Sequence, residues 1–271
     1  MKQINSKSPY FTLYEVVPDI YAAIEKDKMN VGSNAGFFDL GDQLIIFDTF
    51  LNIEAAKDLR QVAKEITGTP VSMVVISHFH TDHIIGLSAF MQEETFKPIV
   101  LTAPFTRNIM EKEFKADIQE IHALPDSKIQ EFRDQLSHAT TKTERLNAEN
   151  TLRFYNNIRH PEVKAVIPNM TIADKIVIHG TKHTVELINV GTAHTTEDII
   201  AYFPTEKVVF MGDLLFSNRD PWIGSGDPMK WVDFTDAFSK NDIEAYIPGH
   251  GSIGTMREIK LQTKYIREMI E

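Results

Sequence analysis

The chain has 271 residues, of which 42% are hydrophobic and 24% charged, values that are ordinary for a soluble globular protein with a full core. The formal net charge of −10 argues against a nucleic acid as the main partner, and the absence of cysteine excludes disulfides, thiolate metal ligands and a cysteine nucleophile. The first residues lack the apolar core of a signal peptide and no apolar run reaches membrane-spanning length, so we expect a cytoplasmic protein that does not bind membranes.

The first fifty residues are rich in β-branched and aromatic side chains, which predicts several strands before the first helix. Gly41 and Asp42 separate the last two of these strands and predict a hairpin turn. Asp48 follows the last strand directly. The expected strands cover residues 11–17, 20–24, 34–40 and 43–47.

A helix is expected over residues 53–66, where apolar side chains recur at helical spacing before Gly68. The next segment, 71–76, is apolar and β-branched and predicts a buried strand. Residues 84–90 are too apolar for a loop and predict the first turns of a second helix.

Between this strand and this helix lies a dense motif, His78-Phe79-His80-Thr81-Asp82-His83. Neutral imidazole nitrogens and carboxylate oxygens are ligands that suit Zn²⁺ and similar divalent ions. His78 and His80 are two residues apart in an extended loop and can point the same way, whereas Asp82 and His83 diverge. The motif can therefore supply two neighbouring metal positions.

Residues 105–160 differ from their surroundings, because apolar side chains recur there at steps of three and four within strongly charged sequence. This pattern predicts an inserted helical hairpin followed by a weaker third helix. The helices could form an ordinary surface or a lid over a cleft, and the sequence leaves both open.

Strands return after residue 165 and alternate with two further helices. Ligand-type residues follow three of these strands: His194, Asp213 and His250, each close to a glycine that lets the backbone approach a crowded centre. The pattern predicts two packed sheets with helices outside. No low-complexity linker divides the chain, so we expect one domain over 1–271 with a helical insertion at 105–160. The expected strands cover 175–178, 183–189, 199–203, 207–211 and 245–247, and the helices 229–239 and 255–270.

The order of these motifs resembles the metallo-β-lactamase superfamily, whose signature is His-x-His-x-Asp-His followed by a His, an Asp and a His at later strand ends. The resemblance runs from about residue 34 to about residue 251, apart from the insertion. It implies an α+β fold, a four-layer αββα sandwich of two mixed sheets with outer helices, and a metal site at one edge. The implied ligands are His78, His80 and His194 at one metal, Asp82, His83 and His250 at the other, and Asp213 as the bridge.

The resemblance also implies a role for Asp48, which would orient a metal-bound imidazole from behind. Two divalent ions, zinc first with iron or manganese as alternatives, can hold a hydroxide between them at neutral pH. Asp82 would orient this hydroxide and carry a proton to the leaving group, which makes it the expected catalytic residue. We therefore expect a metal-dependent hydrolase.

Two positions narrow the choice within the superfamily. Asp213 stands where the zinc β-lactamases carry Cys or Ser, and His80 where the oxygen-reducing diiron branch carries Glu. The set looks most like the glyoxalase II and lactonase type, so we expect cleavage of an ester, thioester or lactone-type acyl bond in a small-molecule substrate. The alternatives are a mononuclear iron dioxygenase acting on persulfides and a phosphodiesterase of the same superfamily.

The loop after Asp213 and the insertion are expected to supply the substrate pocket. The sequence names neither the substrate nor the oligomeric state. The candidate pocket residues on the loop are Phe216, Asn218, Arg219 and Trp222.

Overall fold

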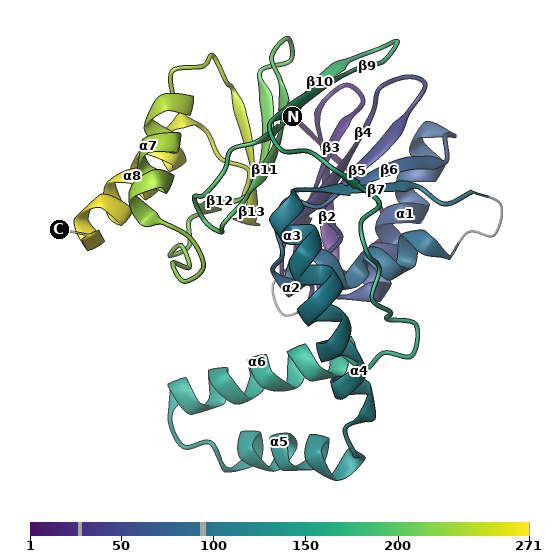
Figure 1. The fold of residues 1–271 in the computed structure, drawn as a ribbon, viewed down its shortest axis with the longest axis vertical. Coiled ribbons are helices and arrows are strands. Elements are labelled where there is room, and N and C mark those ends of the chain that lie inside the picture. The colour runs from purple at the N-terminus through teal and green to yellow at the C-terminus, as the bar shows by residue number, and fades with distance from the viewer. Residues whose placement is uncertain (27–28, 93–95, 271) are drawn as a thin grey trace.

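Two β-sheets pack face to face, and helices cover the outer face of each (Figure 1). The computed structural model describes residues 1–26, 29–92 and 96–270. The result is a four-layer αββα sandwich, which confirms the architecture expected from the sequence. No helix among the described residues is long and apolar enough to cross a membrane.

The first sheet has eight strands that follow one another in chain order. The pairs from β1 to β5 are antiparallel and those from β5 to β8 are parallel. Because β5 and β6 are parallel, their carboxyl ends lie at the same edge of the sheet. The strands are β1 (Lys2–Ile4), β2 (Phe11–Val17), β3 (Ile20–Glu25), β4 (Ala35–Asp39), β5 (Leu44–Phe47), β6 (Val71–Val75), β7 (Ile99–Thr102) and β8 (Met170–Thr171).

The second sheet has five strands in the order β13-β12-β11-β10-β9. Only β12 and β13 pair in parallel. All ten residues of β12 are buried, whereas β9 at the edge alternates exposed and half-buried positions. The strands are β9 (Lys175–His179), β10 (Thr184–Asn189), β11 (Ile199–Phe203), β12 (Val208–Ser217) and β13 (Ala245–Gly251).

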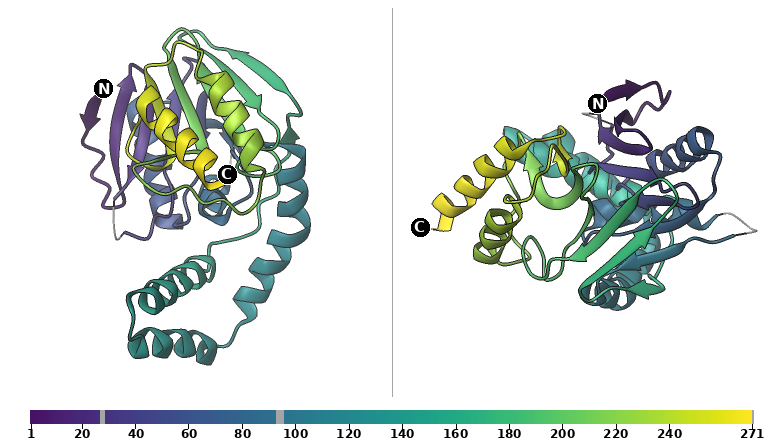
Figure 2. Two further views of the ribbon diagram at one scale, coloured as in Figure 1. Left: turned by 90° about the vertical axis from the view of Figure 1, so that its left-hand side faces the viewer. Right: turned by 90° about the horizontal axis from the view of Figure 1, so that it is seen from above.

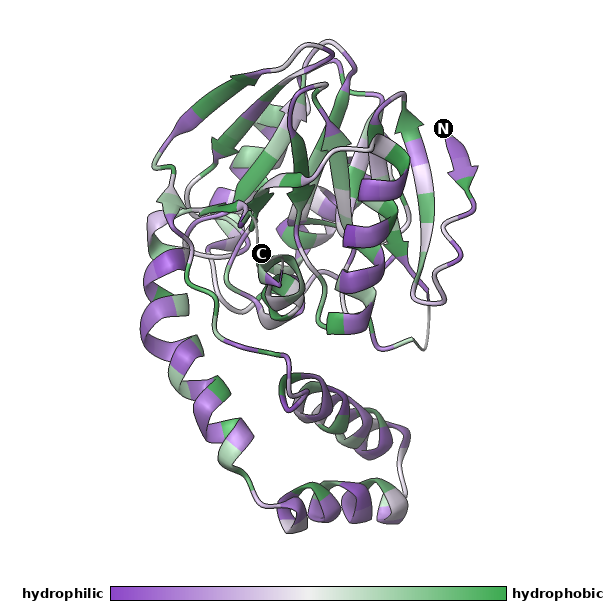
Figure 3. Cartoon of the chain, turned by 90° about the vertical axis from the view of Figure 1, so that its right-hand side faces the viewer, coloured by the Kyte–Doolittle hydropathy of each residue, from purple (hydrophilic) through white to green (hydrophobic). Residues whose placement is uncertain are grey.

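Three apolar clusters fill the spaces between the four layers. The middle cluster lies between the sheets and includes Phe38, Phe203 and Phe210, whose rings pack at 4.9 to 6.5 Å. The outer clusters bury α1 (Ile53–Thr67) on the first sheet and both α7 (Pro228–Phe238) and α8 (Met256–Ile270) on the second. Figure 3 shows the apolar strands inside and polar stripes on the outer helices. Central strands such as β4 and β5 are buried on both faces, which explains their continuous apolar sequences.

The helices of residues 104–158 come between β7 and β8 and extend away from the sandwich (Figure 2). The first three form one rod with a π-helical turn in its middle. α5 and α6 pack on each other through a small cluster of Ile129, Phe132 and Leu152. The third helix, expected to be weak, is the longest of this group, because a capping box between Thr141 and Glu144 starts it early. The elements are α3 (Pro104–Ile109), η2 (Met110–Phe114), α4 (Lys115–Ala123), α5 (Asp126–His138) and α6 (Lys142–Ile158).

The elements that carry the candidate ligands differ from the expected ones in their limits. β12 and β13 continue past Asp213 and His250, so these residues lie within strands and not after them. Gly212, with φ of 51°, accompanies shifts of register between β12 and β13 that turn the strand locally. The helix that was expected after the histidine motif begins within the motif. It starts at Thr81 as α2 (Thr81–Ile84) and continues as a 3₁₀ helix, η1 (Ile85–Met91).

Candidate metal centre

Four segments that are far apart in the sequence meet at one edge of the sandwich. The loop after β6 and the first turn of α2 carry His78, His80, Asp82 and His83, and the loop after β10 carries His194. β12 and β13 bring Asp213 and His250. All seven candidate ligands predicted from the sequence therefore lie in one region, where their side-chain atoms form two groups.

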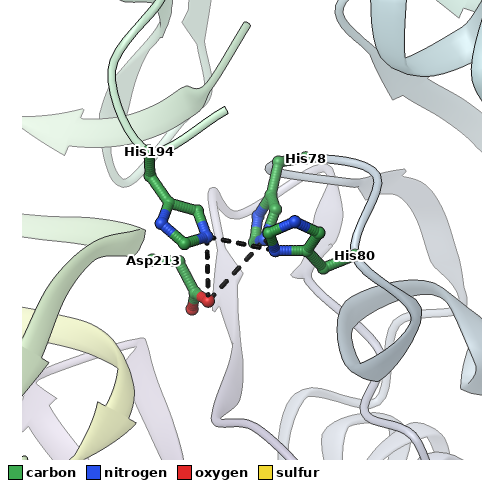
Figure 4. Close-up of side chains that lie close together, drawn as sticks. All are labelled: His78, His80, His194 and Asp213. Carbon is green, nitrogen blue, oxygen red and sulfur yellow. Dashed lines mark hydrogen bonds and ion pairs between the residues drawn. The ribbon is translucent and has the colours of Figure 1, made fainter. Parts of the chain in front are cut away.

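The first group consists of three histidines and one carboxylate, His78, His80, His194 and Asp213 (Figure 4). His80 Nδ1 lies 2.9 Å from His78 Nε2 and 3.0 Å from His194 Nε2. Asp213 Oδ2 lies 3.3 Å from His194 Nε2 and 3.7 Å from His78 Nε2. Three ring nitrogens and one oxygen thus converge on a single point.

The donor set of the first group fits a divalent metal. Ligands about 2.0–2.1 Å from a tetrahedral ion are about 3.3 Å apart, close to the separations observed here. The outward nitrogens of two rings have partners, because His78 Nδ1 lies 2.9 Å from Ser77 Oγ and His80 Nε2 lies 3.1 Å from Ser225 Oγ. Burial lowers the pKa of His78 well below its usual value and that of His80 to about 4, so both rings are neutral and keep lone pairs for a cation.

The second group consists of Asp82, His83 and His250, whose ligand atoms lie within 4.8 Å of one another. Asp82 Oδ2 is 3.4 Å from His250 Nε2 and 4.0 Å from His83 Nε2. Asp82 is the most accessible of the three, with 27% of its side chain exposed. This arrangement suits a second cation beside the first.

Asp213 lies between the two groups and contacts both. Its Oδ1 is 3.0 Å from His83 Nε2, and its Oδ2 is 3.2 Å from His250 Nε2 as well as close to the first group. Burial alone would raise the pKa of Asp213, but His250 and His83 hold it well below its usual value. Gly249 makes room for this carboxylate, because a Cβ at that position would come within 1.9 Å of Asp213 Oδ1.

Asp48 lies behind the two groups and orders the rings of both. Its Oδ2 accepts hydrogen bonds at 2.8 Å from His83 Nδ1 and from the Ser77 hydroxyl, which in turn contacts His78. Its Oδ1 accepts from the Ser77 backbone N–H at 2.8 Å. Asp48 adopts a left-handed φ of 58°, which aspartate tolerates better than most residues. The sequence predicted its position behind an imidazole but gave no sign of the link through Ser77.

A cavity of about 510 Å³ opens above the two groups. Its walls are largely aromatic and acidic. Of the pocket residues expected on the loop after Asp213, Phe216 and Trp222 do line this cavity. The lining residues are Phe79, His80, Thr81, Asp82, Ile109, Glu113, Phe114, Asp117, Asp213, Phe216, Trp222 and His250.

Asn218 and Arg219 do not line this cavity, which corrects the sequence-based expectation. Arg219 pairs with Glu25 at 2.9 Å, and the Asn218 amide donates to Ser252 Oγ at 2.9 Å. Both lie on the other side of Phe216, in a separate hollow against α8. A loop of irregular backbone turns successive side chains in directions that its sequence alone does not encode.

Several residues of the site escaped the sequence analysis. Ser77 and Ser225 are single hydroxyls without a distinctive pattern, and Ser225 contacts His80 across 145 positions of sequence. The lining residues of the insertion, Ile109, Glu113, Phe114 and Asp117, come from η2 and its neighbours. In a regular α-helix Ile109 and Phe114 would not share one face. A π-helical turn brings both side chains to the cavity, so helical spacing in the sequence does not predict this surface.

A third group of possible ligands, Glu54, His160 and Glu162, joins the first turn of α1 to the segment after α6. Lys57 binds both of its carboxylates at 2.8 Å. The group is an ion-pair network on the surface.

Similarity to known proteins covers most of the chain. The model of the metallo-beta-lactamase superfamily matches residues 30–250. A linear primary-alkylsulfatase from Pseudomonas sp. (strain ATCC 19151) is 37% identical over 54 residues, 20% of this chain and 10% of the relative. A type 2 metallo-beta-lactamase from Bacteroides fragilis is 24% identical over 110 residues, 39% of this chain and 44% of the relative. The matched segments thus span less than half the length of either relative.

Solved structures show the same fold over nearly the whole chain. A metallo-beta-lactamase from Pontibacter korlensis superposes with a TM-score of 0.66 at 17% identity, covering 95% of this chain and 99% of the other. The metallo-beta-lactamase FIM-1 from Pseudomonas aeruginosa, solved in its mono-zinc form, gives a TM-score of 0.64 at 15% identity and covers 97% of each chain. At such identities the likeness concerns the fold.

Proposed function

Since the chain belongs to the metallo-β-lactamase superfamily, we propose that it is a hydrolase that uses two divalent metal ions to cleave an ester, thioester or lactone-type acyl bond. The observation that carries the proposal is the position of Asp213. Its Oδ1 lies 3.0 Å from His83 in the second group, and its Oδ2 lies 3.3 Å from His194 in the first group and 3.2 Å from His250 in the second, so one carboxylate can serve two ions. A site for a single ion would not need this second group.

The proposed ligand roles follow the two groups of side chains. The inward nitrogens of three rings are defined by the partners behind them: Asp48 for His83, Ser225 for His80 and Ser77 for His78. The histidine and carboxylate set suits zinc best and is also compatible with iron or manganese. The proposed ligands are His78, His80 and His194 for one ion, Asp82, His83 and His250 for the other, and Asp213 for both.

When bound, the two ions supply a water of lowered pKa as the nucleophile and polarise the oxygen that gains charge. Asp82 is the carboxylate of the second group that reaches into the cavity, so it can take the proton of this water and pass it to the leaving group. Phe216 stacks on His250 at 4.8 Å and Trp222 lies edge-on to His80 at 5.0 Å. These aromatic side chains exclude bulk water from the reacting atoms.

The preference for acyl bonds rests on Asp213, since a carboxylate at the shared position is what the glyoxalase II and lactonase type have. The test is a panel of esters, thioesters, lactones, β-lactams, phosphodiesters and alkyl sulfates, assayed on a sample whose metal content is measured. We expect about two divalent ions per chain, from seven ligands, and turnover of at least one ester, thioester or lactone. Turnover of phosphodiesters or sulfates alone would refute the acyl assignment. One tightly bound iron with consumption of oxygen would instead indicate the persulfide dioxygenase.

A further inference from the structure

The cavity above the ligand groups has an acidic wall that the proposed reaction does not use. Glu113 from η2 and Asp117 from α4 line the cavity, and both residues are exposed. Within the described ranges 1–26, 29–92 and 96–270, neither carboxylate has an ion pair or a hydrogen bond. Glu111 on the same helical rod, in contrast, binds Arg107 at 2.7 Å.

These two carboxylates lie four residues apart and share one face of the rod. Like charges at this spacing destabilise a helix by about 0.2–0.5 kcal/mol. No basic residue stands three or four positions from either one, since those positions hold Ile109, Met110, Phe114, Ala116, Glu120 and Ile121 besides the pair itself. The helix itself therefore offers no compensation for the repulsion, which favours a binding role for the pair over a structural one.

The other residues that line the cavity also suit a ligand that is an organic cation. Phe79, Phe114, Phe216 and Trp222 present aromatic surface to the cavity, and among the lining residues that the structure describes none is a lysine or an arginine. Trp222 keeps 54% of its surface exposed although it is held against His80. Aromatic faces and free carboxylates both attract organic cations. A volume of about 510 Å³ is that of a site for a small molecule.

An independent observation marks the cavity as a ligand site. Asp213, which is 4% exposed, lines the floor of this cavity, and its Oδ1, although 3.0 Å from His83 Nε2, forms no hydrogen bond in the part of the chain that the structure describes. Glu113 and Asp117 line the same cavity as this floor. The reacting group and the acidic wall thus belong to one cavity.

We propose that the substrate carries an organic cation, a quaternary or protonated amine, which Glu113 and Asp117 bind while its acyl group lies over Asp213. This inference rests on the proposed hydrolase function and names the class of its substrate. The aromatic walls would contact the alkyl groups around the nitrogen. A neutral substrate of the same shape would leave both carboxylates unpaired.

Binding can be measured without turnover. Choline and 3,3-dimethylbutan-1-ol have the same shape and hydroxyl group, but only choline is charged. We expect the zinc-loaded protein to bind choline roughly tenfold more tightly in calorimetry, because only choline can form ion pairs with the two exposed carboxylates. Glu113→Gln/Asp117→Asn should abolish this preference, while Glu120→Gln, an exposed carboxylate outside the cavity, should preserve it. Equal affinities in the parent, or a preference that survives the double variant, would overturn the proposal.

Turnover separates this inference from the proposed function. Acetylthiocholine and 3,3-dimethylbutyl thioacetate form the matching pair of thioesters. We expect kcat/KM to favour the cation roughly tenfold in the parent and to be about equal for the two in Glu113→Gln/Asp117→Asn. Equal hydrolysis of both by the parent would refute the cation site and leave the hydrolase standing. A further outcome is that the parent cleaves neither thioester nor any other acyl compound, yet binds choline preferentially, with that preference lost in the double variant. This outcome would support the cation site and refute the acyl function.

Discussion

Asp213 is the residue on which both ligand groups depend. Its two oxygens contact His83 on one side and His194 on the other, so Asp213→Ala should remove one ligand from each metal position. We expect the metal content to fall from about two ions per chain to less than one, measured by elemental analysis after gel filtration.

A matched control for this variant is Asp233→Ala, which removes an exposed carboxylate from α7 away from the site. This control should keep both ions. Loss of only one ion from Asp213→Ala would mean that the carboxylate serves a single position and that the shared role is misassigned.

Asp82 differs from the other carboxylates of the site because it combines access to the cavity with contact to His250 at 3.4 Å. Asp82→Asn keeps the shape of the side chain but removes its ability to take a proton. We expect kcat to fall by roughly 10²–10⁴, the usual contribution of a positioned acid–base group. The rate is to be measured on whichever ester, thioester or lactone the parent cleaves, with the metal content of the same sample. Full kcat with both ions bound would rule out the proton transfer assigned to Asp82.

The rod formed by α3, η2 and α4 is the element that connects the insertion to the reaction. Its π-helical turn brings Ile109 and Phe114 to the cavity together, whereas α5 and α6 pack on each other farther away. The insertion therefore has two parts: a rod that walls the cavity and a helical pair that does not. The sequence left open whether these helices are a lid or a plain surface. In the structure, residues of the rod line the cavity.

Ile109 tests the contribution of this rod. It lines the cavity while only half-buried, so Ile109→Ala should leave the fold and the metal content intact. We expect KM to rise several-fold or the preference among substrates to change, because removing apolar contact with a substrate is worth about 1–3 kcal/mol per group. The measurement is a set of KM and kcat values for each substrate that the parent turns over.

Leu146→Ala on α6 is the control for Ile109→Ala, since Leu146 is apolar, 52% exposed and outside the cavity. It should match the parent on every substrate. If Ile109→Ala also matched the parent throughout, the rod would be a structural surface only.

At the scale of the whole molecule, the site joins the two halves of the sandwich. His78, His80, Asp82 and His83 come from the first sheet and its helices, whereas His194, Asp213 and His250 come from the second sheet. Bound ions would therefore link the sheets at this edge. Ions that bind the folded chain and not the unfolded one stabilise it by mass action.

Metal removal should accordingly destabilise the whole fold. A site occupied at a thousand times its Kd contributes about 4.1 kcal/mol, and each kcal/mol corresponds to roughly 2–4 °C in a chain of this size class. We expect a chelator to lower Tm by about 10 °C in calorimetry and added zinc to restore it. The Asp213→Ala protein should respond much less. An unchanged Tm in the parent would show that the edge is held together without ions.

Much of this protein is determined by sequence signals that lie close together in the chain. Apolar alternation and helical spacing predict β2 to β5, α1, β6 and α8 near their observed limits, because these patterns arise within a few adjacent residues. The motif from His78 to His83 places four candidate metal ligands within six residues. His194, Asp213 and His250 each stand close to a glycine near the end of a predicted strand, so all seven candidate ligands could be named from the sequence.

Tertiary structure decided how these parts meet. Which nitrogen of each ring faces inward depends on partners such as Asp48 for His83 and Ser225 for His80, which are 35 and 145 positions away. The place of Asp213 between both groups depends on Gly249, and the approach of both Ile109 and Phe114 to the cavity depends on a π-helical turn. These features come from packing between distant segments. Such contacts produce no periodic pattern in the sequence of either segment. Local patterns therefore determined the elements and the ligand types, whereas long-range packing determined the geometry of the site and the surface that meets the substrate.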